Sequence, residues 1–123
     1  MVSEIQSGEH FSRAISSKPV VVVDFFATWC GPCKKMEPVL RDWEEGMAEN
    51  GEDWMVRFVK VNVDHHSRIA QSYQVTAMPT FVVFLNGEAK YTVRGARKRE
   101  LRERIESAMQ VASDERNARS RKN

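Results

Sequence analysis

The sequence predicts an α/β domain in which a central mixed sheet of about five strands is flanked by four helices. Runs of β-branched and aromatic residues alternate with stretches whose apolar residues recur every three or four positions. One run, residues 20–26, is apolar apart from a single aspartate, which is typical of a strand buried on both faces. Later in the chain, Asn86-Gly87 is the strongest dipeptide signal for a hairpin, so the last two strands are expected to be antiparallel.

The first half of the chain is expected to hold two strands and two helices. Residues 2–5 predict a short strand, and Ser7 is placed to cap the helix that follows it. The strand at 20–26 comes next. From Cys33 the pattern turns helical until Asn50-Gly51 ends the helix. The inward faces of these two helices are predicted to carry Phe11, Ala14, Ile15, Met36, Val39, Leu40, Trp43 and Met47.

The second half continues the alternation of strands and helices. Residues 55–63 predict a strand, residues 64–73 a short helix, and residues 81–85 a buried strand. After the hairpin turn, residues 89–94 predict the antiparallel partner strand, and a final helix is expected from about Arg97. The inward face of this helix is predicted to carry Leu101, Ile105, Ala108, Met109 and Val111. A crossover order that ends in a hairpin indicates a mixed sheet with helices on both faces.

The chain of 123 residues is expected to form one folded domain over residues 1–111. Residues 112–123 are polar and basic, and we expect them to be a disordered tail. The net charge of +2 is too small to indicate a nucleic-acid partner, and the tail holds no aromatic residue for base stacking. No apolar run approaches the length of a membrane span, so no membrane association is expected.

The two cysteines of the chain, Cys30 and Cys33, directly follow the buried strand and open a helix. Backbone N–H groups at the start of a helix point toward the sulfurs, and the helix dipole favours an anion there. The thiolate is the nucleophilic form of cysteine, so this position favours thiol chemistry.

Two other roles for the cysteine pair are weaker. A structural disulfide stabilises more as the loop it closes grows, and this loop encloses only Gly31 and Pro32. A structural zinc site usually needs four ligands, and the remaining candidates lack the usual spacing (His10, His65 and His66). Reversible dithiol–disulfide chemistry without a metal is therefore favoured. Such chemistry fits a reducing compartment, and the chain begins without an apolar secretory core, so we expect a cytoplasmic protein.

The chain is similar to the thioredoxin family over residues 1–111. The matching segments occur in the same order along the chain, at residues 23–34 (which include Trp29-Cys30-Gly31-Pro32-Cys33), 60–64, 78–81, 86–87 and 95–96. The resemblance implies the thioredoxin fold and a monomeric protein-disulfide reductase. It also implies electrons from an NADPH-dependent thioredoxin reductase, disulfide-containing protein substrates, and no bound cofactor besides a redox-active Cys30–Cys33 disulfide.

The resemblance also implies catalytic roles. Cys30 corresponds to the thiol that attacks the substrate, and Cys33 to the thiol that resolves the mixed disulfide. This division requires one exposed sulfur and one shielded sulfur, and Cys33, deeper in the helix, is expected to be the shielded one. Asp24 corresponds to a buried carboxylate that exchanges a proton with Cys33, and Lys60 to a lysine near that carboxylate. Without the resemblance, Asp24 reads as a strand-end residue that reaches solvent, and Lys60 as an outward lysine.

Further positions are implied around the cysteines. Gly31 and Pro32 shape the active-site turn, and Pro79 is expected to follow a cis peptide bond, although most X–Pro bonds are trans. The backbone of Met78 is then expected to pair with an extended substrate segment. The apolar contact surface is predicted to comprise Trp29, Ala77, Met78, Gly95 and Ala96; the alternative for Trp29 is a core tryptophan.

Two other functions compete with the reductase. The first is a binding or scaffold protein in which the thiol chemistry is incidental, and retention of both cysteines argues against it. The second is a disulfide oxidase or isomerase. The resemblance links Gly31-Pro32 between the cysteines to reducing members of the family, which disfavours this second alternative.

Overall fold

The computed structural model describes residues 2–122 and contains one five-stranded sheet with the spatial order β1-β3-β2-β4-β5. The strands are β1 (Ser3–Glu4), β2 (Val20–Phe26), β3 (Val56–Asn62), β4 (Thr80–Leu85) and β5 (Glu88–Arg94). The helices are α1 (Gly8–Ile15), α2 (Gly31–Glu49), α3 (Ser67–Ser72) and α4 (Lys98–Lys122). The predicted α/β class and the predicted order of elements are confirmed.

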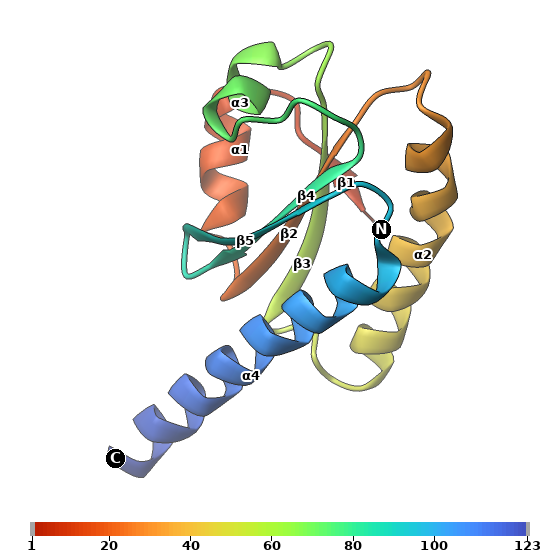
Figure 1. Ribbon diagram of the computed structural model, residues 1–123. Coiled ribbons are helices and arrows are strands. Elements are labelled where there is room, and N and C mark those ends of the chain that lie inside the picture. Colours follow the sequence, from red (N-terminus) through yellow and green to blue (C-terminus); the bar gives the residue numbers. More distant parts are fainter. Residues whose placement is uncertain (1, 123) are drawn as a thin grey trace.

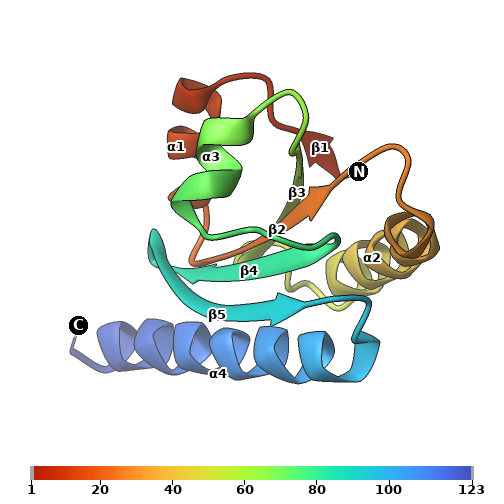
Figure 2. The same ribbon diagram turned by 45° about the horizontal axis from the view of Figure 1, so that its top comes forward.

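The sheet is mixed, and helices cover both of its faces. Strand β2 pairs in parallel with β3 and antiparallel with β4, while β1 lies parallel to β3 and β5 antiparallel to β4. Helices α1 and α3 lie on one face and α2 and α4 on the other (Figures 1 and 2). The predicted hairpin is confirmed: Asn86 and Gly87 both have positive φ angles, of 53° and 85°, as its tight turn requires.

Strand β2 lies at the centre of the sheet, and all seven of its residues are buried. Because successive side chains point to opposite faces, its apolar residues divide between two cores. Val20 and Val22 pack in the core beneath α2 and α4, whereas Val21, Val23 and Phe25 pack in the core beneath α1 and α3. The alternation places Asp24 in the row of Val20 and Val22, so its carboxylate faces the side of the sheet that α2 covers.

The starts of two helices are set by their caps. Ser7 accepts a hydrogen bond of 3.0 Å from the backbone N–H of His10, which confirms the predicted cap of α1. Helix α2 begins at Gly31, two residues earlier than predicted. Cys30 caps this helix with its sulfur, and Pro32 fits the first turn because no intrahelical donor is needed there.

The disorder expected for residues 112–123 is not found over residues 112–122, because α4 continues as a helix to Lys122; residue 123 lies outside the described residues. Ala112 is buried in the core beneath α2 and α4, whereas Val111, predicted to face inward, is exposed. Two contacts hold the turn of α4 that follows Ala112 in place. Glu115 accepts a hydrogen bond of 3.0 Å from the side chain of Asn86, and the Arg116 guanidinium lies 4.2 Å from the centre of the Trp54 ring.

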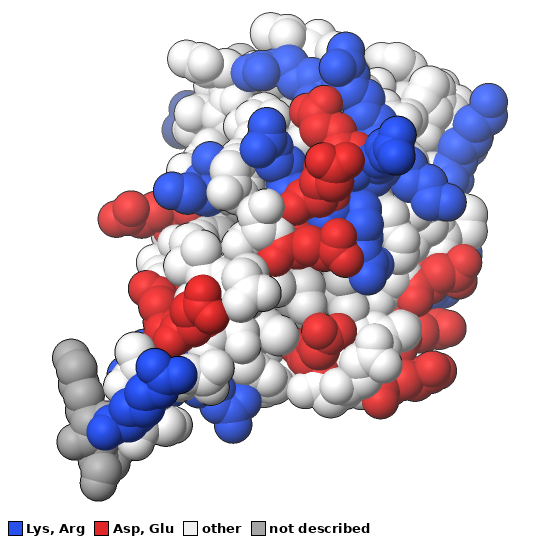
Figure 3. All heavy atoms as spheres, turned by 60° about the horizontal axis from the view of Figure 1, so that its bottom comes forward, with Lys and Arg blue, Asp and Glu red and all other residues white. Residues whose placement is uncertain are grey.

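The surface of α4 is strongly charged, and its charges are mixed in sign. Acidic and basic side chains are interspersed on the face that Figure 3 shows. Several of them form ion pairs one turn apart, such as Arg99 with Glu103 and Arg102 with Glu106. Within residues 2–122, no helix is long and apolar enough to cross a membrane.

Candidate active site

Cys30 and Cys33 lie at the start of α2 and are joined by a disulfide bond, with their Cα atoms 5.3 Å apart. Cys30 has an extended backbone as the residue that precedes the helix, and the backbone N–H of Cys33 donates a hydrogen bond of 3.2 Å to the Cys30 sulfur. The sulfur that the sequence predicts to attack therefore lies where helix N–H groups point. An anion on this atom is stabilised by that hydrogen bond and by the positive end of the helix dipole.

Both cysteines are almost fully buried in this disulfide-bonded form. Cys30 is 5% exposed and Cys33 is 2% exposed, so Cys33 is the more shielded of the two, as predicted. The expectation of an exposed Cys30 is wrong for the disulfide form. Phe26, Ala27 and the partly buried Met78 pack around the pair.

The loop before β4 lies directly against the disulfide. The peptide bond between Met78 and Pro79 is cis, which confirms the geometry that the resemblance implied. The carbonyl oxygen of Met78 lies 3.5 Å from the Cys30 sulfur. The loop is held by two hydrogen bonds: the Thr80 hydroxyl donates to the carbonyl of Ala77 at 2.6 Å, and the N–H of Gly95 donates to the carbonyl of Pro79 at 2.7 Å.

The residues predicted to contact a substrate gather around this loop. Trp29 is 67% exposed, which confirms its surface position. Its indole N–H donates a hydrogen bond of 3.1 Å to the carboxylate of Asp64, which orients the ring beside Cys30. The structure thus brings the predicted contact residues to the same end of the sheet as the disulfide: Trp29 and Met78 adjoin Cys30, Ala77 is exposed before the cis bond, and Gly95 and Ala96 follow β5.

Asp64 was not predicted as part of this site. It follows the carboxyl end of β3, the edge of the sheet at which the cysteines also lie, and its backbone N–H donates to the side chain of Asn62 at 2.9 Å. A polar residue directly after a buried parallel strand is the signal that would have found it.

Asp24 is buried beneath α2. Its carboxylate is only 2% exposed, and its Oδ1 has no hydrogen-bond partner among the residues that the structure describes. Burial in a low-dielectric region raises the pKa of Asp24 from 3.8 to about 7; Lys60 acts in the opposite sense and Glu37 in the same sense. The alternative in which Asp24 reaches solvent at a strand end is therefore wrong.

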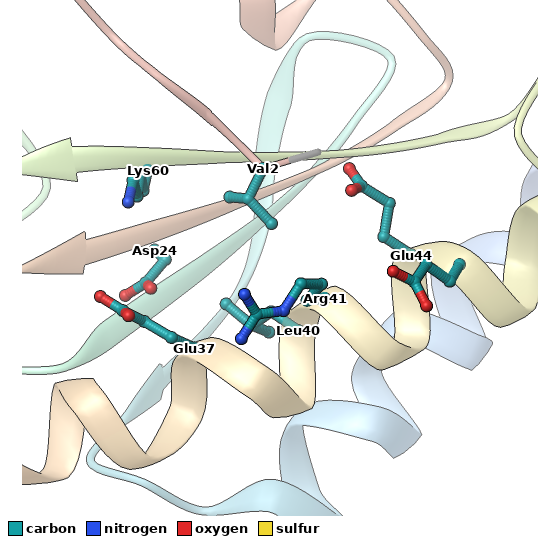
Figure 4. A pocket seen from close by; sticks show the side chains of 8 residues that line it. Val2, Asp24, Glu37, Leu40, Arg41, Glu44 and Lys60 are labelled. Atoms are coloured by element: carbon teal, nitrogen blue, oxygen red, sulfur yellow. The ribbon is translucent and has the colours of Figure 1, made fainter.

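Lys60 lies beside Asp24, as predicted. The two residues are directly paired across β2 and β3, and both face α2. The Lys60 ammonium also lies 5.3 Å from the centre of the Phe26 ring. Together with α2, the two side chains border a cavity of about 410 Å³ that reaches the surface (Figure 4).

Only Asp24 and Lys60 of the residues that line this cavity were predicted as site residues; Glu37 and Arg41 are two of the charged ones that were missed. They lie four and eight positions after Cys33, and residues at these spacings share one face of a helix. This spacing is the signal that would have identified them. Among residues 2–122, no group of three His, Cys, Asp or Glu side chains is arranged to hold a metal ion.

The chemistry of this site is set by the small ring that the two cysteines close. The ring lies at the helix start in a small cluster of its own, apart from the two cores on either side of the sheet. The fold and this cysteine pair define a domain with a disulfide-bonded Cys-x-x-Cys pair at the start of a helix, an arrangement suited to thiol–disulfide exchange.

Comparison with known proteins identifies the family. The thioredoxin family model matches residues 2–107, and the chain belongs to the thioredoxin family. A thioredoxin of Malassezia sympodialis is 45% identical over 95 residues, which cover 77% of this chain and 87% of that protein. The crystal structure of Malassezia sympodialis thioredoxin superposes with a TM-score of 0.78 at 41% identity, covering 89% of this chain and 91% of that one.

Other relatives differ in length and compartment. The chain spans about half the length of two of them, 52% of Thioredoxin-2 of Pyricularia oryzae and 55% of the chloroplastic Thioredoxin Y of Oryza sativa. These two are 40% and 41% identical to this chain over 77% and 79% of its length. A mitochondrial thioredoxin of Saccharomyces cerevisiae is also among the structural relatives.

Proposed function

We propose that this protein reduces disulfide bonds in other proteins. The observation that supports this most directly is the position of the Cys30–Cys33 disulfide at the start of α2, with the N–H of Cys33 bonded to the Cys30 sulfur. In the reduced protein the same N–H stabilises a thiolate on Cys30, the form that attacks a disulfide.

The reaction has two exchange steps. The Cys30 thiolate attacks one sulfur of the substrate disulfide, a Cys30–substrate disulfide forms, and the second substrate sulfur leaves as a thiolate that takes a proton from water. Cys33 then loses its proton to Asp24 and attacks the Cys30 sulfur. The Cys30–Cys33 disulfide forms, the remaining substrate sulfur leaves as a thiolate, and two electrons have passed to the substrate.

Asp24 suits the role of proton acceptor for Cys33. A general base is most effective when its pKa lies near the working pH, and burial brings that of Asp24 to about 7. Lys60 favours the ionised form of this carboxylate and so limits the effect of burial.

The substrate is proposed to bind as an extended segment across the cis-proline loop. The backbone of Met78, whose carbonyl lies against the Cys30 sulfur, would pair with the segment on one side of its disulfide. The exposed indole of Trp29 would cover the other side, with Ala77, Gly95 and Ala96 completing an apolar surface. Gly31 and Pro32 keep the turn between the cysteines short, since they are the two residues inside the ring.

The electrons are proposed to come from an NADPH-dependent thioredoxin reductase, and the protein to act as a monomer in the cytoplasm. The dithiol pair fits a reducing compartment, although relatives carry chloroplastic and mitochondrial names. A fluorescent fusion of the full chain tests the compartment, and light scattering tests the monomer. Organellar fluorescence or a stable dimer would contradict these two proposals.

The reductase activity is tested by NADPH-coupled reduction of insulin with a thioredoxin reductase. The wild-type chain is expected to be active, and Cys30→Ser inactive. Cys33→Ser should accumulate a mixed disulfide with insulin, because it retains the attacking thiol and lacks the resolving one. Absence of activity in the wild type, with the protein folded, would favour a binding protein. A strongly oxidising reduction potential would favour an oxidase.

A further inference from the structure

The cavity beside Asp24 brings a second carboxylate, that of Glu37, to the buried one. Asp24 comes from the central strand β2, and Glu37 comes from α2, which covers it. Both side chains line the same cavity, and Figure 4 shows the Glu37 carboxylate directed toward that of Asp24. The two carboxylates are therefore placed to interact across this cavity.

The position of Glu37 follows from the helix. It lies four residues after Cys33, one turn further along α2, so the two side chains lie on the same side of the helix. Unlike Asp24, Glu37 is exposed to solvent. Its carboxylate therefore contacts water and, across the cavity, faces a group that water hardly reaches.

The other charged groups that line the cavity beside Asp24 come from β3 and α2: Lys60, Glu37, Arg41, Glu44 and Glu45. Lys60 and Glu37 are the two whose charges act appreciably on Asp24, in opposite senses. The neighbouring residue of β4, Phe81, carries no charge, and the disulfide-bonded cysteines do not titrate. A negative neighbour disfavours a second negative charge, so Glu37 counteracts Lys60.

We propose that Glu37 is a positioning residue that acts through Asp24: its carboxylate, facing Asp24 across the cavity, makes Asp24 a stronger base for the proton of Cys33. The inference extends the proposed reductase mechanism and rests on it only for the step at Cys33. A base that holds its proton more tightly removes the Cys33 proton more readily, so Glu37 speeds the resolving attack. Lys60 opposes this effect from the neighbouring strand.

The interaction is tested first in the oxidised chain by NMR titration of the Asp24 carboxyl carbon. Glu37→Gln is expected to lower the titration midpoint by about half a pH unit, the size expected for one charge acting through a partly solvated space. Glu45→Gln removes the same charge from the same cavity and should leave the midpoint unchanged, whereas Lys60→Met should raise it. An unmoved midpoint in Glu37→Gln, or equal shifts in both glutamate variants, would overturn the proposal.

The consequence for catalysis is tested in the reduced chain by following release of a disulfide peptide in a single turnover at a series of pH values. In Glu37→Gln the pH profile of the resolving step should move to lower pH by the same amount as the NMR midpoint. Above that midpoint, the rate of the resolving step in Glu37→Gln should fall about twofold, because Asp24 is a weaker base in this variant. A profile that coincides with that of the wild type would refute the role at Cys33. An inactive wild type would instead refute the reductase proposal and leave the titration result intact.

Discussion

Replacement of Asp24 by asparagine should stabilise the protein, and the gain should depend on pH. In the unfolded chain the carboxyl group ionises near its ordinary pKa of 3.8, whereas burial raises the pKa of Asp24 in the folded protein to about 7. Between these values the folded state binds the proton that the unfolded state has released. Stability of the wild type therefore falls as the pH rises from about 4 to about 7, and the penalty is complete above pH 7.

The size of this penalty follows from the two pKa values. Each pH unit between them corresponds to 1.36 kcal/mol, so the loss amounts to about 4 kcal/mol at pH 8. Asparagine has nearly the same shape and cannot ionise. Its buried amide brings a cost of its own, but that cost does not change with pH. The difference in unfolding free energy between Asp24→Asn and the wild type should therefore rise by about 4 kcal/mol from pH 4 to pH 8.

The measurement is denaturant unfolding of both oxidised proteins at intervals between pH 4 and pH 8.5. The oxidised form is used because no thiol then titrates in the folded state. Asp42→Asn, which removes an exposed carboxylate from α2, is the control. It shows how much the pH dependence of the unfolding free energy changes when a carboxylate that is not buried is lost. A stability difference that stays flat over this range for Asp24→Asn would refute the reasoning, because it would mean that Asp24 ionises alike in the folded and unfolded chains.

Three further predictions concern the end of α4 and the substrate surface. Arg116→Ala should lower the unfolding free energy by about 1 kcal/mol in denaturant titrations, because the contact of Arg116 with Trp54 is lost. The control Arg119→Ala should lower the unfolding free energy less, and equal losses in the two variants would contradict a stabilising contact with Trp54. Removal of residues 113–123 should reduce the helical circular dichroism signal per chain, whereas an unchanged signal would indicate that this segment is disordered. Trp29→Ala should raise the KM for insulin roughly tenfold with little change in kcat, and an unchanged KM would show that the indole is not part of the docking surface.

Most of the fold was predictable because local and long-range preferences agree. The apolar run of β2 matches its burial on both faces, and Asn86-Gly87 matches the positive φ angles of its turn. The end of α4 was not predictable from composition. A polar segment usually lacks the apolar area to hold itself in place, but Ala112 is buried and Arg116 meets Trp54, a residue 62 positions earlier in the sequence.

The site was predictable in part. The positions of Cys30 and Cys33 follow from the strand and helix pattern, whereas the burial of Asp24 came from the resemblance, because a lone aspartate in an apolar strand otherwise reads as a strand end. The cis bond before Pro79 came only from the resemblance, since nothing local distinguishes it from a trans bond. The burial of Cys30 in the disulfide form was missed because it depends on how tightly the tertiary fold packs Phe26, Ala27 and Met78 around the pair.

The size of the ring closed by the two cysteines has a consequence for folding. A cross-link that spans two intervening residues restricts the unfolded chain only slightly, so cutting it returns little disorder to that state. The β-sheet and its two packed faces, rather than the sulfur–sulfur bond, must then supply nearly all the resistance to unfolding. We therefore expect the fold to stay intact whether this disulfide is formed or broken.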